Sequence, residues 1–124
     1  MVYGIGTDII EVDRVGALVS KGPGHLNHVF TPREIEFCES KRNKNQHYAA
    51  RFAAKEAFMK ALGTGWNLGI AFTQIEVVPN QLGKPEIVLH GKALEFAERE
   101  EIIRIHLSIT HIKELANAIV IIET

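Results

Sequence analysis

The hydrophobic pattern of the first 20 residues predicts one strand followed by a short helix. Val2 to about Ile10 is typical of a strand. Glycines at alternate positions within it, Gly4 and Gly6, indicate that another element packs very close to one face. Asp13 to Val19 predicts a short helix, and the glycines and proline of "KGPGH" that follow it predict a loop.

The segment "FTPREIEFCESK" carries a helix start. Thr31 stands at the N-cap position, Pro32 at the first helical position and Glu34 at the third, which together form a capping box with the favoured proline. We expect this helix to end near Ser40, in a polar run.

A longer helix is predicted from about His47 to Leu62, with Gly63 placed to end it. At about 100° per residue, four small residues share one face and allow close packing. These residues are Ala50, Ala54, Ala57 and Ala61. Arg51 and Lys55 lie on one edge of this buried face, and Glu56 and Lys60 lie on the other.

Glu56 and Lys60 are one helical turn apart, so they have two interpretations. An ordinary surface pair of this kind contributes about 0.2–0.5 kcal/mol to helix stability and is common. Here the pair is flanked by Phe52 and Ala53, and the helix runs into "GTG", whose glycines let a ligand approach the backbone. These neighbours favour a ligand-binding cleft.

The C-terminal half changes to a period of two. Phe72 to Val78 and Glu86 to His90 predict a hairpin joined by "PNQLGKP". "GKALEFAEREE" predicts a short helix with Leu94 and Phe96 to Ala97 on its inner side. "IIRIHLSIT" and "LANAIVIIE" predict two further strands. We therefore expect one α+β domain over residues 1–124, with a largely antiparallel sheet packed against a long central helix and shorter helices.

Composition and charge fit a globular chain. Of its residues 46% are hydrophobic, which leaves apolar surface for an oligomer interface, and the net charge of −1 gives no overall attraction to nucleic acid. The stretch from Ser40 to Lys60 holds six cations and one anion, a local charge of +5 that leaves −6 for the rest. A site for phosphates or an acidic partner and an ordinary solvated surface account for this cluster equally well.

The N-terminus has neither a basic region nor a long apolar run, so we expect no signal peptide and no membrane span. Cys38 is the single cysteine and forms no internal disulfide, which suits a reducing compartment. The expected location is the cytoplasm.

Asp8 is a candidate partner for Glu56. It stands among Ile5, Ile9 and Ile10, where the strand is expected to bury both faces, and a buried carboxylate needs a partner. Two carboxylates suit Mg²⁺, which takes one or two of them together with phosphates and waters. Spacing alone does not establish such a site, and a hydrogen-bonded turn at the strand end is the alternative.

Five segments resemble, in order and spacing, the holo-acyl-carrier-protein synthases, a family of small bacterial 4′-phosphopantetheinyl transferases. These segments are "YGIGTDIIEVDRV", "FTPREIEFC", "RFAAKEAFMKALGTG", "GKPEIVL" and "LSITH". The resemblance runs from the first strand to the last, with Thr7 standing where the family often has an apolar residue. It implies transfer of the 4′-phosphopantetheine arm from coenzyme A to a serine of apo-acyl carrier protein, which serves fatty acid biosynthesis and releases adenosine 3′,5′-bisphosphate.

The resemblance also implies roles for residues. Asp8 and Glu56 correspond to the Mg²⁺ ligands, Lys60 to a catalytic lysine near the pyrophosphate, and Arg14 to a basic residue that meets the carrier protein. Family members are trimers with active sites between subunits. The residues expected to bind coenzyme A are Arg51, Lys60, Gly63, Gly65, Lys84, Pro85, Thr110 and His111.

A non-enzymatic alternative is a small trimeric module that binds coenzyme A or a nucleotide without turnover. Such a module would keep Arg51, Lys60 and His111 for phosphates but would not need both carboxylates. The presence of both Asp8 and Glu56 favours the enzyme.

Overall fold

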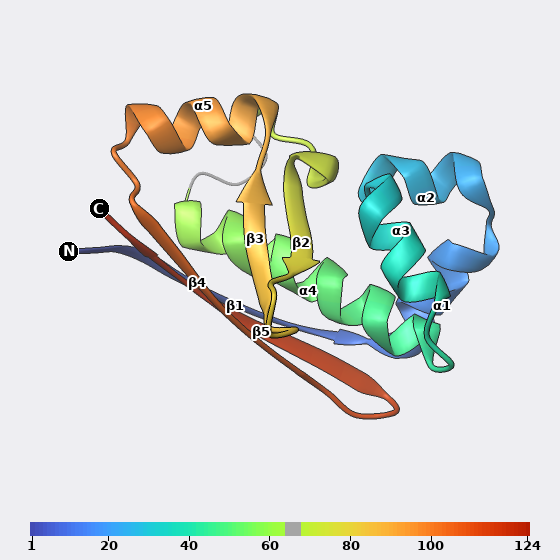
Figure 1. Cartoon of the computed structure of the whole chain (residues 1–124). Helices are drawn as coiled ribbons and strands as arrows, with labels where there is room; N and C mark the ends of the chain where they lie inside the picture. Colours follow the sequence, from blue (N-terminus) through green and yellow to red (C-terminus); the bar gives the residue numbers. More distant parts are fainter. Residues whose placement is uncertain (64–67) are drawn as a thin grey trace.

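The computed structural model describes residues 1–63 and 68–124, so the expected coenzyme residue Gly65 lies outside the described part. Figure 1 shows the arrangement of the helices and strands. In chain order the elements are β1 (Val2–Glu11), α1 (Val12–Ser20), α2 (Pro23–Val29), α3 (Pro32–Glu39), α4 (Lys44–Leu62), a 3₁₀ turn (Phe72–Gln74), β2 (Ile75–Pro79), β3 (Pro85–Leu89), α5 (Gly91–Arg99), β4 (Arg104–His111) and β5 (Leu115–Glu123).

The strands form two antiparallel sheets where the sequence predicted one. The larger sheet has the order β1-β5-β4, and β2 and β3 form a separate hairpin. The chain passes through α5 between the hairpin and the larger sheet (Figure 1). The α+β class and the antiparallel pairing are confirmed.

The larger sheet brings the two ends of the chain together. The terminal ammonium of Met1 donates to the carbonyl oxygen of Thr124 at 2.7 Å. Across the sheet, Asp8 of β1 pairs with Ala118 of β5, which pairs with Ile109 of β4. Asp8 and Ile109 therefore lie on opposite outer strands of this sheet.

The predicted helix ends are largely confirmed. At the start of α3, Thr31 Oγ1 accepts from the backbone N–H of Glu34, and a carboxylate oxygen of Glu34 accepts from the N–H of Thr31, as the capping box requires. Gly63 ends α4 in the left-handed conformation with φ of 77°. The loop predicted at "KGPGH" is wrong, because Pro23 opens α2; proline suits this position, where no helical N–H bond is lost.

Two further details of the C-terminal half differ from the prediction. The strand predicted from Phe72 begins only at Ile75, after the 3₁₀ turn. Leu94 is not on the inner side of α5 but half-exposed, whereas Ala93, Phe96 and Ala97 are buried.

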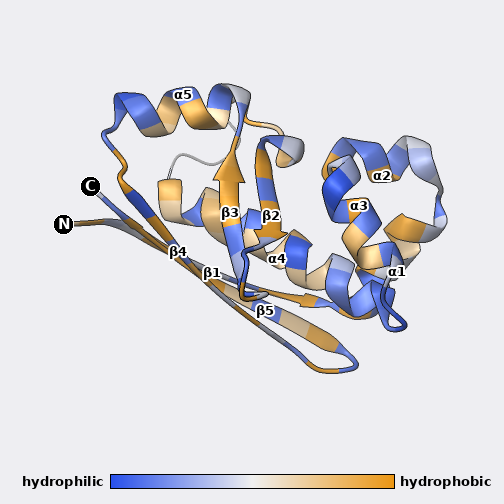
Figure 2. Cartoon of the chain, viewed as in Figure 1, coloured by the Kyte–Doolittle hydropathy of each residue, from blue (hydrophilic) through white to orange (hydrophobic). Residues whose placement is uncertain are grey.

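The core lies where α4 crosses the larger sheet. The alanine stripe of α4 is buried, and so are the inward positions of β4 and β5, such as Leu107, Val120 and Ile122. Hydrophobic and hydrophilic positions accordingly alternate along the strands in Figure 2, and α4 carries mixed bands along its length. No helix in the described part of the chain is long and apolar enough to cross a membrane.

Helix α4 is also buried on a side that the sequence assigned to an edge. The ammonium of Lys55 is fully enclosed and donates to three oxygens, each at 2.8 Å: a carboxylate oxygen of Glu34 and the carbonyls of Phe72 and Ile75. Glu34 also accepts from the N–H of Val77. This buried ion pair joins α3, α4 and β2 at one point.

Candidate active site

The first candidate cluster depends on how closely α4 lies on β1. A Cβ atom added at Gly4 would stand 1.9 Å from the carbonyl oxygen of Ala61, and one at Gly6 would stand 1.8 Å from that of Ala57. Only glycine leaves room for this contact, so the expected close approach at these positions is confirmed. It brings one edge of α4 against the next inward residue of β1.

That next residue is Asp8. Lys60 of α4 donates to the carboxylate of Asp8 at 3.1 Å and to the carbonyl of Thr7 at 3.0 Å, while its side chain stays 55% exposed. The expectation that isoleucines enclose Asp8 on both faces is wrong, because Ile5 and Ile9 lie on the outer face and are 60% and 64% exposed. Asp8 instead faces α4, in the same row as the two glycines.

Glu56 completes this cluster. Its side chain is partly buried, and burial raises its pKa; the nearby carboxylate of Asp8 raises it further, and Lys60 acts in the opposite direction. A raised pKa is expected when two carboxylates face one space. Lys60 bonds to Asp8, so the ordinary pair between Glu56 and Lys60 is not what holds the lysine.

The donor set of this cluster fits Mg²⁺. No group of three or more His, Cys, Asp or Glu side chains that could hold a metal occurs within residues 1–63 and 68–124. A site for zinc or another metal that needs several protein ligands is therefore not indicated there. Two carboxylates are enough for Mg²⁺ when phosphate oxygens and waters supply the other positions.

A second cluster surrounds a cavity of about 220 Å³ that Arg51, Pro85 and His111 help to line. Arg51 is only 4% exposed, and its guanidinium carbon lies 3.9 Å from the centre of the Phe37 ring. The Nε atom of Arg51 is buried without a hydrogen-bond partner in the described structure. Arg51 nevertheless helps to line the cavity, so its positive charge favours an anionic ligand there.

Three residues of this second cluster were not predicted from the sequence. They are Phe37, Gln46 and His47. Gln46 Oε1 lies 2.9 Å from Nδ1 of His111, and the rings of His47 and His111 are 5.3 Å apart. Burial lowers the pKa of His47, and electrostatic interactions with His111 and Arg51 lower it further. Gln46 and His47 lie near Arg51 in the sequence, and this was the only signal for them. Their contact with His111 of β4 spans more than 60 positions and could not be read from spacing.

The other expected coenzyme residues are more scattered. Thr110 is exposed on β4 beside His111, and Lys84 lines a different, larger cavity together with Pro85. Gly63 lies one turn beyond Lys60, at the end of α4.

The two clusters lie at opposite sides of the larger sheet. Asp8 belongs to the outer strand β1, whereas His111 belongs to the outer strand β4, with β5 between them. The fold of one chain therefore brings the acidic cluster together and the Arg51 cluster together, but does not join them.

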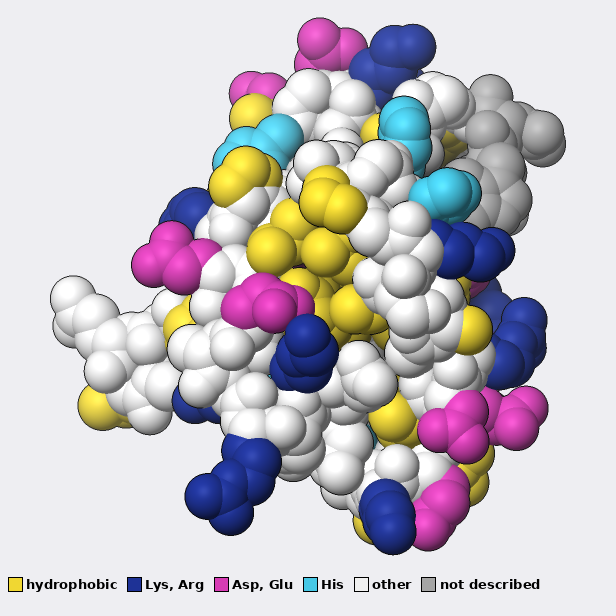
Figure 3. Space-filling view, turned by 90° about the vertical axis from the view of Figure 1, so that its right-hand side faces the viewer, with side chains coloured by type: hydrophobic (Ala, Val, Ile, Leu, Met, Phe, Trp, Pro, Cys, Tyr) yellow, Lys and Arg dark blue, Asp and Glu magenta, His cyan; other side chains and the backbone are white. Residues whose placement is uncertain are grey.

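The basic segment is smaller at the surface than its sequence suggested. Lys55 and Arg51 are buried, so the exposed cations around the start of α4 are Lys41, Arg42 and Lys44. Arg14 is exposed on α1. Figure 3 shows the side of the molecule that carries α1 to α3, where hydrophobic side chains gather in a hollowed centre and charges of both signs surround them.

The chain is similar to known proteins over its whole length. The family model of the 4′-phosphopantetheinyl transferase superfamily matches residues 4–119. The holo-[acyl-carrier-protein] synthase of Geotalea daltonii is 45% identical over 124 residues, which cover 99% of each chain.

Solved structures agree with this assignment. A holo-[acyl-carrier-protein] synthase from Neisseria meningitidis superposes with a TM-score of 0.90 at 35% identity, over 100% of both chains. A holo-(acyl-carrier-protein) synthase from Bacillus anthracis in complex with CoA (3′,5′-ADP) gives a TM-score of 0.82 at 36% identity, covering 100% of this chain and 98% of that one. The chain therefore belongs to the 4′-phosphopantetheinyl transferase superfamily and is, within it, a holo-[acyl-carrier-protein] synthase.

Proposed function

We propose that this enzyme transfers the 4′-phosphopantetheine arm of coenzyme A to a serine of apo-acyl carrier protein, with Mg²⁺ held by Asp8 and Glu56. The products are holo-acyl carrier protein and adenosine 3′,5′-bisphosphate, and the pathway served is fatty acid biosynthesis. The observation that carries the proposal is the cluster of Asp8, Glu56 and Lys60 between β1 and α4.

Phosphoryl transfer depends mostly on positioning and on charge neutralisation. When bound, Mg²⁺ supplies Lewis-acid stabilisation of the pyrophosphate oxygens. Lys60 is held by Thr7 and Asp8 but remains half-exposed, so its ammonium can turn toward charge that develops on the leaving group. Glu56, which belongs to the same cluster, is the candidate to accept the proton of the attacking serine.

The coenzyme is proposed to bind through residues from both clusters. The complex of the Bacillus anthracis relative with CoA supports a coenzyme site in this fold. In this chain the positive charge of Arg51 at the wall of the second cavity, next to His111 and Pro85, favours a phosphate there. The complete set is Arg51, Lys60, Gly63, Gly65, Lys84, Pro85, Thr110 and His111.

A homotrimer would unite the two clusters across a subunit boundary. The outer face of the larger sheet supports this assembly, because Ile5, Ile9 and Ile119 are exposed on it and no element of the described chain covers them. An exposed apolar face of this kind is typical of an interface. Sedimentation that shows only a monomer near 14 kDa at micromolar concentration would contradict the trimer.

The exposed cations suggest how the carrier protein binds. Arg14 is proposed to bind the acidic carrier protein, aided by the exposed run from Lys41 to Lys44.

The cysteine bears on the compartment. The thiol of Cys38 is free and buried, and burial raises its pKa to about 12. A free cysteine fits a reducing compartment, and we propose the cytoplasm.

Mass spectrometry tests the proposed reaction directly. Apo-acyl carrier protein incubated with this protein, coenzyme A and Mg²⁺ should gain the mass of one phosphopantetheine arm. A carrier protein whose serine is replaced by alanine should gain nothing. Binding of coenzyme A without any mass gain would support the non-enzymatic alternative.

A further inference from the structure

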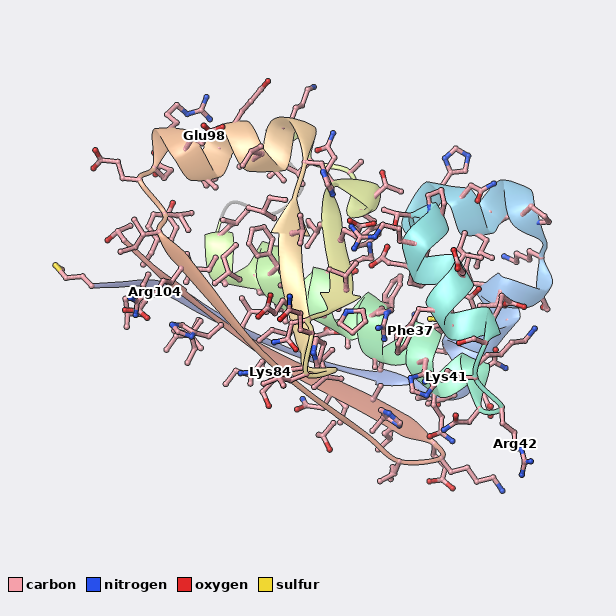
Figure 4. All side chains as sticks on the ribbon, in the orientation of Figure 1. Phe37, Lys41, Arg42, Lys84, Glu98 and Arg104 are labelled. Carbon is pink, nitrogen blue, oxygen red and sulfur yellow. The ribbon has the colours of Figure 1, made fainter. Side chains whose placement is uncertain are left out.

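Two polar side chains lie beside Asp8 on the outer face of the larger sheet. Thr7 of β1 is exposed there and Asn117 of β5 is partly exposed, whereas Asp8 faces α4 on the inner side. Figure 4 shows the side chains of the outer face projecting away from α4. Their neighbours Ile5 and Ile9 on this face are apolar, so the two polar residues interrupt an apolar surface.

The backbone of Asp8 belongs to a doubly bonded pair of the sheet. Asp8 of β1 stands opposite Ala118 of β5. The N–H of Val12 donates to the carbonyl of Glu114, and this bond sets the alternation along the two strands. Asp8 and Ala118 therefore exchange both of their backbone hydrogen bonds, from N–H to carbonyl in each direction.

Both polar side chains add a bond to this pair. Asn117 Nδ2 donates to the carbonyl oxygen of Asp8 at 2.9 Å. The hydroxyl of Thr7 donates to the carbonyl oxygen of Ala118 at 3.1 Å, and Thr7 Oγ1 lies 3.5 Å from Asn117 Nδ2. Each carbonyl of the pair thus accepts a side-chain bond in addition to its bond within the sheet.

The position of Asp8 needs such support. In the described structure β1 pairs only with β5, so its other edge has no neighbouring strand. Gly6, two residues before Asp8, adds conformational freedom to the backbone. On the free edge Lys60 donates to the carbonyl of Thr7 at 3.0 Å. Thr7 and Asn117 hold the same short segment from the side of β5.

We propose that Asn117 and Thr7 are positioning residues for Asp8, acting from the face of the sheet opposite its carboxylate. This inference rests on the proposed function, in which Asp8 binds Mg²⁺. The direction of the Cα–Cβ bond follows the backbone torsions, so a fixed carbonyl at Asp8 restricts where its carboxylate lies. A ligand that is held in place in advance binds its metal more tightly.

The alternative is that the two residues serve only an interface between subunits on the outer face. Apolar variants of the same shape separate the two roles. Thr7→Val and Asn117→Leu remove the donors but keep an apolar surface, so the assembly should persist in both. Thr7→Ser keeps the hydroxyl and should behave like the parent. Ser108→Ala is the matched control, because Ser108 is exposed on β4, with β5 between it and β1.

Mg²⁺ binding gives the first measurement. Calorimetric titration of the coenzyme-bound enzyme should show a Kd for Mg²⁺ that is about 10-fold higher in Thr7→Val and in Asn117→Leu than in the parent. At saturating Mg²⁺, kcat should stay within about 2-fold of the parent, because Asp8 itself is retained. Thr7→Ser and Ser108→Ala should leave the Kd unchanged.

Amide exchange in EDTA gives a second measurement, without metal or turnover. The N–H groups of Asp8 and Ala118 should exchange with solvent about 5-fold faster in the two apolar variants, since one supporting bond is lost. Those of Gly4 and Ile122, a pair farther along the same strands, should not change.

The outcomes decide between the two roles. An unchanged Kd for Mg²⁺ in both apolar variants would overturn the inference, whatever the exchange shows. Sedimentation that shows dissociated subunits, with faster exchange along the whole of β1, would assign the residues to the interface and also overturn it. Absence of any mass gain on the carrier protein with the parent enzyme would instead reject the proposed function.

Discussion

Lys55 and Lys60 stand five residues apart on one helix, and each forms an ion pair with a carboxylate from a distant part of the chain. The pair of Lys55 with Glu34 is fully buried at 2.8 Å, and two carbonyls take the other protons of the lysine. The pair of Lys60 with Asp8 measures 3.1 Å, and more than half of this lysine is exposed.

This difference distinguishes a lysine that stabilises the fold, Lys55, from one that can contact a substrate, Lys60. Burial lowers the pKa of Lys55, and Glu34 opposes that change, so the pair depends on both partners being present. The ammonium of Lys60 is exposed to solvent, so a substrate phosphate can replace its hydrogen bonds to Thr7 and Asp8. Replacing each lysine in turn tests this contrast.

The largest loss of stability should come from Lys55→Met. It leaves the carboxylate of Glu34 buried without its cation, which lowers the free energy of unfolding by about 3–5 kcal/mol. Urea unfolding measures the change. Adding Glu34→Gln should recover part of the loss, because the uncompensated charge is then removed. A loss below about 1 kcal/mol would mean that Lys55 is not a structural ion.

Lys60→Met should reverse the pattern. Its exposed pair contributes at most about 1 kcal/mol, so urea unfolding should scarcely change. Transfer activity should fall about 10²–10³-fold, since a donor near developing charge is lost. Retained turnover in a folded Lys60→Met variant would assign Lys60 to an ordinary surface pair.

Arg14→Glu should produce a smaller and more selective effect. Reversing this exposed charge on α1 should raise KM for the carrier protein about tenfold and leave KM for coenzyme A nearly unchanged. Added salt should act in the same direction, because exposed charges are screened beyond about 10 Å at 0.1 M. Equal changes in both constants would contradict a role in carrier binding.

The smallest effect concerns Glu76, a buried carboxylate beside the Lys55 pair. Burial acts to raise its pKa, but hydrogen bonds with Thr31 and His90 outweigh burial and lower it. A lowered folded-state pKa gives stability that is present above the usual carboxyl pKa and is lost as the pH falls through the folded value. Glu76→Gln should therefore lose less stability than the parent between about pH 5 and about pH 3. Parallel urea midpoints for both proteins over this range would contradict the assignment.

Local features of the fold could be predicted from the sequence. The capping box at Thr31 and the glycine end of α4 depend on residues a few positions apart. The close packing at Gly4 and Gly6 could also be predicted, because alternate glycines weaken a strand and are favoured where another backbone packs against it.

Features set by distant contacts could not be predicted in this way. Nothing in the spacing pairs Glu34 with Lys55, 21 residues away, so the pattern alone places the lysine at an edge of the helix. The exposure of Ile5 and Ile9 depends on which face of the larger sheet α4 covers. A sequence pattern predicts burial for apolar residues on either face, so it could not show this exposure. Residue type and the family resemblance pair Asp8 with Glu56, and the structure adds their common position with Lys60.

The most direct test of the central claim measures transfer by the parent, Asp8→Asn and Glu56→Gln, each with Mg²⁺ and with EDTA. The account predicts that each variant loses nearly all transfer, that the parent loses it in EDTA, and that both variants fold at least as stably as the parent in the chelator, because one of two repelling carboxylates is gone. Mg²⁺ should raise the Tm of the coenzyme-bound parent and do so much less in either variant. Parent-like turnover in both variants, or full turnover of the parent in EDTA, would contradict a magnesium site at Asp8 and Glu56.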